Sequence, residues 1–321
     1  MIAVEGLTKR YGERTAINGL TFQANKGEVV GFLGPNGAGK TTTMRILTGY
    51  MPPSAGEGKV AGYDLLTESI EVRRRVGYLP ENVPLYPEMT VVQYLDFMAE
   101  LRKIDDRNDR VDEVMEQVHI AERADSFIGN LSKGLRQRVG LAQALLHKPE
   151  VLIMDEPMEG LDPQQQIEVK RLIREVGHEH TVMLSTHILA HAQELCNRVI
   201  IINAGQIVAE DTPERLGAQL AGGGRVHLVV DGDGAGLLPE LQKLPGLTEV
   251  SAVRDGQFEI VTAPGPDPRP DIAAKVVGGG WKLLELRRER LSLEEIFIEL
   301  TREAAEEPAA AEPDAETAET A

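Results

Sequence analysis

The segment Gly-Pro-Asn-Gly-Ala-Gly-Lys-Thr at residues 34–41 constrains the fold of this chain more than any other feature. It follows a short apolar run at residues 29–33 and opens a helical apolar pattern carried by Met44, Ile46 and Leu47. This is the pattern G-x-x-x-x-G-K-[ST] in the strand, loop and helix setting that it requires. The glycines let backbone N–H groups turn inward at the start of a helix, where anions bind. The segment therefore predicts a phosphate-binding loop in an α/β fold.

Two side chains of this loop have expected chemical roles. The Lys40 amine would add a positive charge at the β- and γ-phosphates of a nucleotide, and the Thr41 hydroxyl could bind Mg²⁺ at the helix N-terminus. The residues expected to contact the nucleotide are Gly34, Pro35, Asn36, Gly37, Ala38, Gly39, Lys40, Thr41 and Thr42. A chance glycine-rich turn is the competing interpretation, and the strand and helix around the loop argue against it.

The size and composition of the chain limit its class. Its 321 residues exceed the ~250–300 residues at which a single core stops growing, so we expect two unequal domains. No stretch approaches the roughly 18 apolar residues of a membrane-spanning helix. Residues 1–5 do not begin a signal or transit peptide, and a cytoplasmic protein is expected. Cys196 is the single cysteine, which rules out an internal disulfide, and we expect it to be structural.

Acidic residues dominate the charge balance. The net charge is −17, and seven acidic residues follow the last basic residue, Arg302, which leaves about −10 for the rest of the chain. These seven residues are Glu303, Glu306, Glu307, Glu312, Asp314, Glu316 and Glu319. A body of this charge is repelled by nucleic acid and by anionic lipid headgroups. Nucleic acid is therefore not expected as a partner, and any membrane contact is expected through a protein.

Hydrophobic patterns divide the chain into parts. Short apolar runs alternate with helical patterns from residue 2 to about residue 207, which favours a parallel sheet. At about residues 82–149 the apolar residues recur only at helical spacing, and an inserted helical subdomain is expected there. Three glycines at residues 222–224 indicate a flexible joint. We assign residues 1–221 to a nucleotide-binding domain and residues 225–300 to a C-terminal accessory domain.

The accessory domain follows the order strand, helix, strand, strand, helix, strand. The expected elements are residues 225–230, 237–244, 247–253, 257–262, 271–277 and 281–287. This order predicts a ferredoxin-like α+β module. An amphipathic helix is expected at residues 291–300. The acidic segment 303–321 has too few apolar residues to pack, and we expect it to be disordered.

A second motif ends in two adjacent carboxylates. Residues 152–154 have the pattern of a buried strand, and Asp155 and Glu156 follow at its end. Beside a phosphate-binding loop, Asp155 could hold Mg²⁺ through water, and Glu156 could orient and deprotonate an attacking water. Paired acids at a strand end are also common as solvated caps. The catalytic interpretation therefore depends on the loop in the same sheet.

Residues 131–138, Leu-Ser-Lys-Gly-Leu-Arg-Gln-Arg, carry a resemblance to a known family. The segment is similar to the signature segment of ABC ATPases and precedes the paired acids, as in that family. The resemblance implies that Ser132 and Gly134 open a helix whose N-terminus faces the γ-phosphate bound by the opposite subunit, as anions bind at helix dipoles. Lys133 and Leu135 depart from the commonest form, so direct contacts are not carried over to them.

Three further positions resemble the family pattern. Asp162, in a Gly-Leu-Asp-Pro segment, would contact the other subunit; otherwise the segment is a turn before a helix. His187 resembles the switch histidine that contacts the γ-phosphate and keeps Glu156 oriented. Tyr11 matches the aromatic residue that stacks on adenine, or it is an ordinary strand tyrosine. His187 and His191 also have i,i+4 spacing, but no third zinc ligand is apparent.

Glu81 departs from the family pattern, which generally has glutamine there to contact Mg²⁺ and link to the helical subdomain. Glutamate keeps an oxygen that can reach the metal but adds a charge near the phosphates. Either it binds the metal less directly, or the correspondence is shifted by one residue. We assign Glu81 as a metal ligand together with Thr41 and Asp155. The segment 81–90 and the appended C-terminal domain resemble the bacterial ABC-2 type exporters, including multidrug, sodium and gliding-associated members.

The resemblance implies both fold and function. The expected fold is that of a P-loop NTPase of the ABC ATPase type, an α/β domain with a mixed sheet core and an inserted helical subdomain, followed by a small ferredoxin-like α+β module. The chain would bind and hydrolyse ATP with Mg²⁺ and energise transport through separate integral membrane permease subunits, peripherally on the inner face of the cell membrane. Two copies, most simply a homodimer, would close head to tail around two ATP molecules. A groove near residues 81–94 would receive the permease.

Two other functions stay open from the sequence. A soluble ABC ATPase of translation or DNA repair would need no membrane subunit, but translation members usually carry two ATPase domains, and repair members carry coiled coils or zinc sites. Alternatively, the C-terminal module would make the chain chiefly a regulator. The translocation path of this family is formed by other polypeptides, so these motifs do not encode the substrate.

Overall fold

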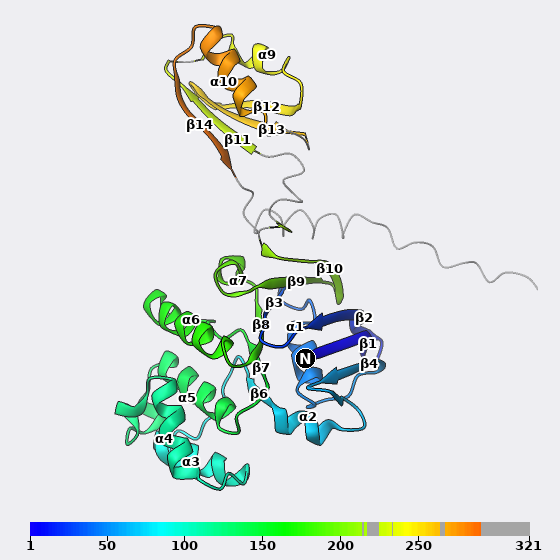
Figure 1. Ribbon diagram of the computed structural model, residues 1–321, viewed down its shortest axis with the longest axis vertical. Helices are drawn as coiled ribbons and strands as arrows, with labels where there is room; N and C mark the ends of the chain where they lie inside the picture. Colours follow the sequence, from blue (N-terminus) through cyan, green and yellow to red (C-terminus); the bar gives the residue numbers. More distant parts are fainter. Residues whose placement is uncertain (214, 217–224, 233, 264–266, 290–321) are drawn as a thin grey trace, which may run out of the picture.

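The structure is a computed structural model that describes residues 1–213, 215–216, 225–232, 234–263 and 267–289 (Figure 1). Its strands form one six-stranded sheet and two four-stranded sheets. The glycine joint at 222–224, the helix expected at 291–300 and the acidic segment 303–321 lie outside the described residues. None of the helices in the described ranges has the length and apolar character that a bilayer span requires.

The largest sheet has the strand order β10-β9-β3-β8-β7-β6. Its strands are β3 (Val29–Leu33), β6 (Val76–Leu79), β7 (Val151–Asp155), β8 (Thr181–Thr186), β9 (Arg198–Asn203) and β10 (Gln206–Asp211). Neighbours are parallel except β10, which is antiparallel to β9. All residues of β3, β7 and β8 are buried, as expected for a sheet covered on both faces. The predicted mixed sheet core is confirmed.

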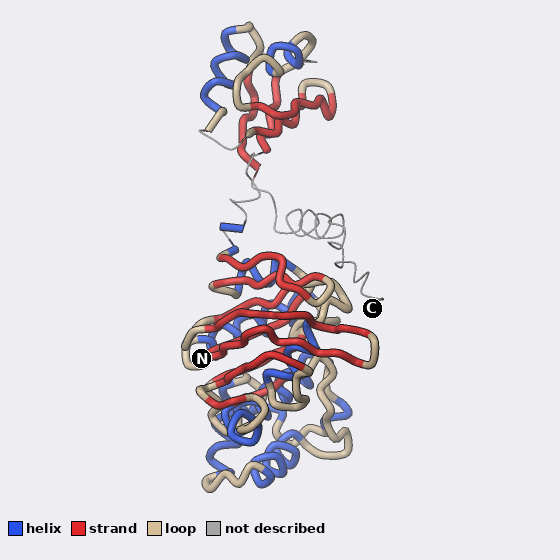
Figure 2. The backbone as a smooth tube through the Cα atoms, turned by 90° about the vertical axis from the view of Figure 1, so that its right-hand side faces the viewer, coloured by secondary structure: helices blue, strands red, loops and turns tan. Residues whose placement is uncertain are grey.

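A second, antiparallel sheet has the order β2-β1-β4-β5 and lies beside the first (Figure 1). Its strands are β1 (Ile2–Tyr11), β2 (Arg14–Ala24), β4 (Ala55–Val60) and β5 (Tyr63–Asp64). Figure 2 shows the strands running side by side across the body, and β1, which starts at the N-terminus, lies between β2 and β4. The hydrophobic pattern did not distinguish this sheet from the parallel one, because β4, Ala-Gly-Glu-Gly-Lys-Val, is short of apolar residues.

Helix α1 (Lys40–Leu47) joins the two sheets through one core. Its Met44 lies in the same buried cluster as Leu7 and Leu20 of the antiparallel sheet and Phe32 of β3. The nearby α2 (Ser69–Arg75) adds Val72 to this cluster. Because α1 begins directly after the phosphate-binding loop, this packing fixes the position of the loop between the sheets.

Residues 82–149 contain helices and no strand, as predicted for the inserted subdomain. The elements are α3 (Val91–Leu101), α4 (Arg107–Gln117), the 3₁₀ turns η1 (Ala121–Arg123) and η2 (Ile128–Asn130), and α5 (Lys133–Leu145). Thr90 caps α3: its hydroxyl accepts from the Gln93 N–H, and the Gln93 side chain accepts from the Thr90 N–H. This reciprocal pair sets where α3 starts.

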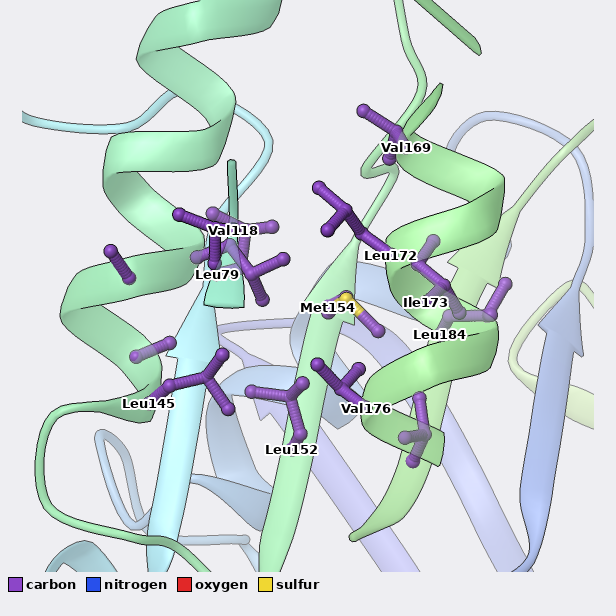
Figure 3. Packing of buried hydrophobic residues seen from close by; sticks show 14 of the residues in the cluster. Leu79, Val118, Leu145, Leu152, Met154, Val169, Leu172, Ile173, Val176 and Leu184 are labelled. Carbon is purple, nitrogen blue, oxygen red and sulfur yellow. The ribbon is translucent and has the colours of Figure 1, made fainter. Parts of the chain in front are cut away.

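Helices α5 and α6 (Pro163–Gly177) pack over β6, β7 and β8, and α7 (Leu189–Leu195) packs against β3 and β8. Figure 3 shows Leu145 of α5 and Leu172 of α6 on either side of Met154 of β7, within one buried cluster. Each such side chain contributes about 1.5–3 kcal/mol when it is fully buried. The packing holds the carboxyl ends of β7 and β8, where the paired acids and the histidine of the sequence motifs lie.

The third sheet has the order β12-β13-β11-β14, with antiparallel neighbours. Its elements are β11 (Arg225–Val230), α9 (Leu237–Leu241), β12 (Leu247–Arg254), β13 (Gln257–Thr262), α10 (Arg269–Gly278) and β14 (Leu283–Glu289). The element and strand orders are those of a ferredoxin-like module, as predicted. Helix α10 starts earlier than expected because Pro270 fits its first turn.

Cys196 lies in the core, beside β3. Burial raises the pKa of its thiol to about 12, so thiolate is scarce near neutral pH. We predict that a colorimetric disulfide reagent labels Cys196 only after the protein is unfolded in guanidinium chloride. Rapid labelling of the native protein at mildly alkaline pH would contradict the structural role of this residue.

Candidate nucleotide-binding and catalytic site

The phosphate-binding loop is held by close contact with two strands. Gly39 has a left-handed φ of 110°, and a Cβ atom there would lie 2.6 Å from Ile17 Cγ2 and 2.8 Å from the Ala16 carbonyl oxygen of β2. A Cβ atom at Gly34 would lie 2.4 Å from the Ile202 carbonyl oxygen of β9. Both positions therefore require glycine. The contacts leave the loop little freedom to move away from the start of α1.

Lys40 reaches back across this loop. Its Nζ donates hydrogen bonds to the carbonyl oxygens of Gly34 at 2.7 Å and Pro35 at 3.2 Å. It also lies 3.3 Å from Glu156 Oε1, and the side chain is only 6% exposed. An ammonium in this position can exchange a carbonyl oxygen for a phosphate oxygen without leaving its place.

A pocket of about 330 Å³ opens beside the loop. It is lined by Tyr11, Arg14, Ala16, Asn36, Gly37, Gly39, Lys40, Thr41, Thr42, Glu81 and Glu156. The sequence predicts each of these as a site residue except Arg14 and Ala16. Of the remaining predicted loop residues, Gly34 and Pro35 bond to Lys40 through their carbonyls, and Ala38 packs in the core.

Tyr11 lies at the end of β1 on the border of the pocket, and 47% of it is exposed. Its hydroxyl donates to Met51 Sδ at 3.1 Å, and Lys9 Nζ lies 5.5 Å from the ring centroid. An exposed ring in this place can stack on a base. Arg14 is the strand partner of Tyr11 in β2, and no sequence pattern singled it out. The adenine contact of Tyr11 stays a prediction.

The paired acids are joined by a serine that the sequence analysis missed. Asp155 ends β7 and is 1% exposed, and Glu156 follows with a left-handed φ of 47°. Ser185, the β8 register partner of Asp155, donates from Oγ to Asp155 Oδ1 at 2.6 Å and accepts from the Glu156 N–H at 2.9 Å. Such a backbone conformation costs about 1–3 kcal/mol and persists only when its surroundings fix it. Ser185 supplies that constraint at Glu156.

Replacing Ser185 with alanine leaves the Asp155 carboxylate and the Glu156 N–H without this partner. We predict that the free energy of unfolding falls by about 1–3 kcal/mol, the cost of unpaired buried polar groups. We also expect kcat for ATP hydrolysis to fall by about tenfold, which is ~1.4 kcal/mol of activation free energy. Urea unfolding and phosphate release measure the two effects. The exposed Ser251→Ala variant is the control, and an unchanged kcat in Ser185→Ala would contradict the positioning role.

The Glu156 carboxylate lies between a cation and a histidine. Its Oε1 is 3.3 Å from Lys40 Nζ, and its Oε2 is 3.1 Å from His187 Nδ1. Among the described residues Oε1 makes no hydrogen bond, although it is buried. A carboxylate with one oxygen held by a histidine and the other ion-paired without a hydrogen bond can orient a water and accept its proton. The structure thus brings Glu156, Lys40 and His187 together, and their catalytic roles stay a prediction.

The oxygen ligands predicted for Mg²⁺ lie around the same pocket. Thr41 and Glu81 line it, and Asp155 ends the strand beside Glu156. A hydroxyl and two carboxylates are the hard oxygen ligands that Mg²⁺ prefers. Glu156 Oε1, which is buried without a hydrogen bond, and the adjacent Asp155 carboxylate also favour a cation nearby. The residues present therefore fit Mg²⁺.

Ser132, Gly134 and Asp162 do not line the pocket but belong to a neighbouring surface. Ser132 caps α5, and its hydroxyl accepts from the Leu135 N–H at 3.3 Å. Asp162 caps α6 and accepts from the Gln165 N–H at 2.9 Å. A Cβ atom at Gly134 would lie 2.7 Å from Gln165 Oε1, so the two helix starts are in contact. These residues present two helix N-termini on one surface, apart from the pocket of the same chain.

The fold and this site define a P-loop nucleoside triphosphatase: a phosphate-binding loop after β3, paired acids after β7 and a histidine after β8. The sequence matches the family model described as ABC transporter over residues 17–159. It is 32% identical over 305 residues to the linearmycin resistance ATP-binding protein LnrL of Bacillus subtilis (strain 168), covering 94% of this chain and 98% of that protein. It is 36% identical over 306 residues to the daunorubicin resistance ATP-binding protein DrrA3 of Streptomyces coeruleorubidus, covering 94% of this chain and 95% of that protein.

Another relative is the Nod factor export ATP-binding protein I of Ralstonia nicotianae (strain ATCC BAA-1114 / GMI1000), 33% identical, with 94% of each chain covered. A solved ATP-binding subunit of an ABC transporter superposes with a TM-score of 0.62 at 31% identity, covering 69% of this chain and 93% of that one. The chain therefore belongs to the ABC transporter family, and it is an ATP-binding subunit that hydrolyses ATP. ATP-binding subunits of this family dimerise and work with membrane permeases.

Proposed function

We propose that the chain is the ATPase subunit of an exporter of the ABC-2 type, acting as a homodimer on the cytoplasmic face of the membrane. Relatives named for drug resistance and for Nod factor export match over 94% of its length, and this observation carries the proposal. None of these relatives is named for translation or DNA repair, so that alternative has no support here.

In the proposed mechanism, Glu156 accepts a proton from water while the water oxygen bonds to the γ-phosphorus. The bond from that phosphorus to the β–γ bridging oxygen breaks, and ADP and phosphate are the products. Lys40 places its charge on the phosphates, and His187 keeps the carboxylate oriented while contacting the γ-phosphate. Mg²⁺ held by Thr41, Asp155 and Glu81 would neutralise charge on the phosphates.

The complete site is proposed to need a second copy of the chain. The pocket is lined by the phosphate loop and Glu156, and His187 contacts Glu156 beside it, whereas Ser132, Gly134 and Asp162 lie on another surface. The N-terminus of α5 carries a partial positive charge that favours a γ-phosphate. A head-to-tail pair would place this helix end of each copy over the pocket of the other.

Light scattering on the Glu156→Gln chain tests the composite site, because slow hydrolysis keeps ATP bound. The mass of 35.1 kDa should double on addition of ATP. Adding Ser132→Arg should abolish the doubling while a fluorescent ATP analogue still binds the monomer. The control adds Glu116→Arg on the exposed end of α4 instead, and it should still dimerise. A Ser132→Arg chain that dimerises normally would contradict the arrangement.

The permease is proposed to dock near residues 81–94, between the sheet core and the helical subdomain. Exposed aromatic and aliphatic side chains lie in this segment and on the later turns of α3: Tyr86, Phe97 and Leu101. The Tyr86 ring lies edge-on to Tyr94 with centroids 5.8 Å apart, and its centroid is 6.0 Å from that of Phe97. Because Tyr86 follows Glu81 of the nucleotide pocket closely in the chain, this apolar patch could transmit closure of the ATPase pair to a membrane subunit.

A further inference from the structure

Glu159 faces the second ring nitrogen of His187. The Nδ1 atom lies 3.1 Å from Glu156 Oε2, and the Nε2 atom lies 3.6 Å from Glu159 Oε2. The nearest ligand atoms of the three side chains all lie within 4.8 Å of one another. The imidazole therefore lies between two carboxylates, of which the Glu156 side chain is 10% exposed and the Glu159 side chain is 41% exposed.

The backbone holds Glu159 in this place. Its N–H donates to the Glu156 carbonyl oxygen at 3.1 Å, which closes a tight turn directly after the catalytic glutamate. The next residue, Gly160, has a left-handed φ of 64° and continues the turn toward Asp162. The proposed hydrolysis assigns no role to Glu159, and yet the turn places its carboxylate on the reacting side of His187.

A γ-phosphate at His187 must be met by a ring nitrogen. Because Nδ1 faces Glu156, the available nitrogen is Nε2, which faces Glu159 in this structure. One ring N–H cannot serve both acceptors fully, and the carboxylate and the phosphate repel each other. We propose that Glu159 is a specificity-determining residue that competes with the γ-phosphate for His187 Nε2, and so weakens the binding of ATP relative to ADP.

The inference rests on the proposed contact between His187 and the γ-phosphate. ADP has no γ-phosphate, so its affinity should not depend on this competition. ATP binding would require the Glu159 side chain to turn away, and Glu159 shares its loop with Asp162, the proposed contact to the other copy. The conformation of this loop would then depend on whether ATP is bound.

Equilibrium binding of a non-hydrolysable ATP analogue and of ADP, both with Mg²⁺, tests the inference on the full chain. Glu159→Ala should raise the affinity for the ATP analogue by about threefold, the scale of a partly exposed ion pair, and leave the affinity for ADP unchanged. The control is Glu179→Ala, an equal charge change on an exposed residue after α6, and it should change neither affinity. Equal tightening of both nucleotides by Glu159→Ala would overturn the inference, because it would be a general charge effect.

A His187→Ala variant separates this inference from the proposed function. It should weaken the binding of the ATP analogue and leave the binding of ADP unchanged. Adding Glu159→Ala to this variant should then change neither affinity further. If His187→Ala leaves both affinities unchanged, the γ-phosphate contact itself is wrong, and the inference falls with it. If His187→Ala weakens the ATP analogue but Glu159→Ala has no effect in the native chain, only the inference is overturned.

Discussion

Replacing Glu156 with glutamine should lower kcat for ATP hydrolysis by about 10²–10⁴-fold, the range typical of a general base. The amide keeps the size of the side chain and its place between Lys40 and His187, but it cannot take the proton of the attacking water. ATP should still bind, because the phosphate loop is unchanged. Release of inorganic phosphate at saturating ATP measures the effect.

The matched control for this variant is Glu179→Gln, which makes the same chemical change on an exposed residue outside the pocket. Its kcat should stay within about twofold of the native value, which corresponds to under ~0.5 kcal/mol of activation free energy. Near-native turnover in the Glu156→Gln chain would reject Glu156 as the base. Loss of ATP binding in that chain would instead point to a role for the carboxylate in holding the loop through Lys40.

Replacing Lys40 with alanine should lower the affinities for both ATP and ADP by about 10–150-fold. This is the equivalent of one lost hydrogen bond to a charged group, about 1.5–3 kcal/mol. The amine is buried against the Gly34 and Pro35 carbonyls and forms an ion pair with Glu156 Oε1, so its loss also leaves that buried oxygen without its ion-pair partner. Titration with fluorescent nucleotides measures the affinities.

Two outcomes of the Lys40→Ala experiment are informative. The loss should apply to ADP as well as ATP, because the amine is expected to contact the β-phosphate, which both carry. This distinguishes it from the effect expected at Glu159, which concerns ATP alone. Lys9→Ala, which removes an amine 5.5 Å from the Tyr11 ring centroid, is the control and should leave the affinity within a few-fold of the native value. Affinities within twofold of native for Lys40→Ala would contradict the phosphate contact.

The sequence predicted the parts of the site that depend on local patterns. The phosphate loop needs glycines beside a strand and a helix, and the paired acids end an apolar run, so both are visible along the chain. The C-terminal module was predicted from its element order, because turn residues such as those at Asp255 and Gly256 separate its strands. The placement of Ser132 and Asp162 toward a second copy stays a prediction, since their surface lies apart from the pocket.

Features that depend on long-range register could not be predicted. Ser185 bridges the acids only because β7 and β8 pair with Asp155 opposite Ser185. Its one signal was a polar side chain near the end of an otherwise apolar strand. Arg14 enters the pocket because β2 pairs with β1 beside Tyr11, and Glu159 meets His187 because a tight turn folds back over the site. In each case the contact depends on strand pairing or on a tight turn, and neither produces a periodic pattern along the sequence.

The central claim is tested most directly by purifying the tagged chain from detergent-solubilised membranes of its native host in the presence of ATP. Mass spectrometry of the co-purifying proteins should find a polytopic membrane subunit in stoichiometric amount, and an exposed Tyr86→Ala variant should reduce its recovery. Recovery of ribosomes or DNA-repair factors without any membrane subunit would contradict the account of this chain as the ATPase of an exporter.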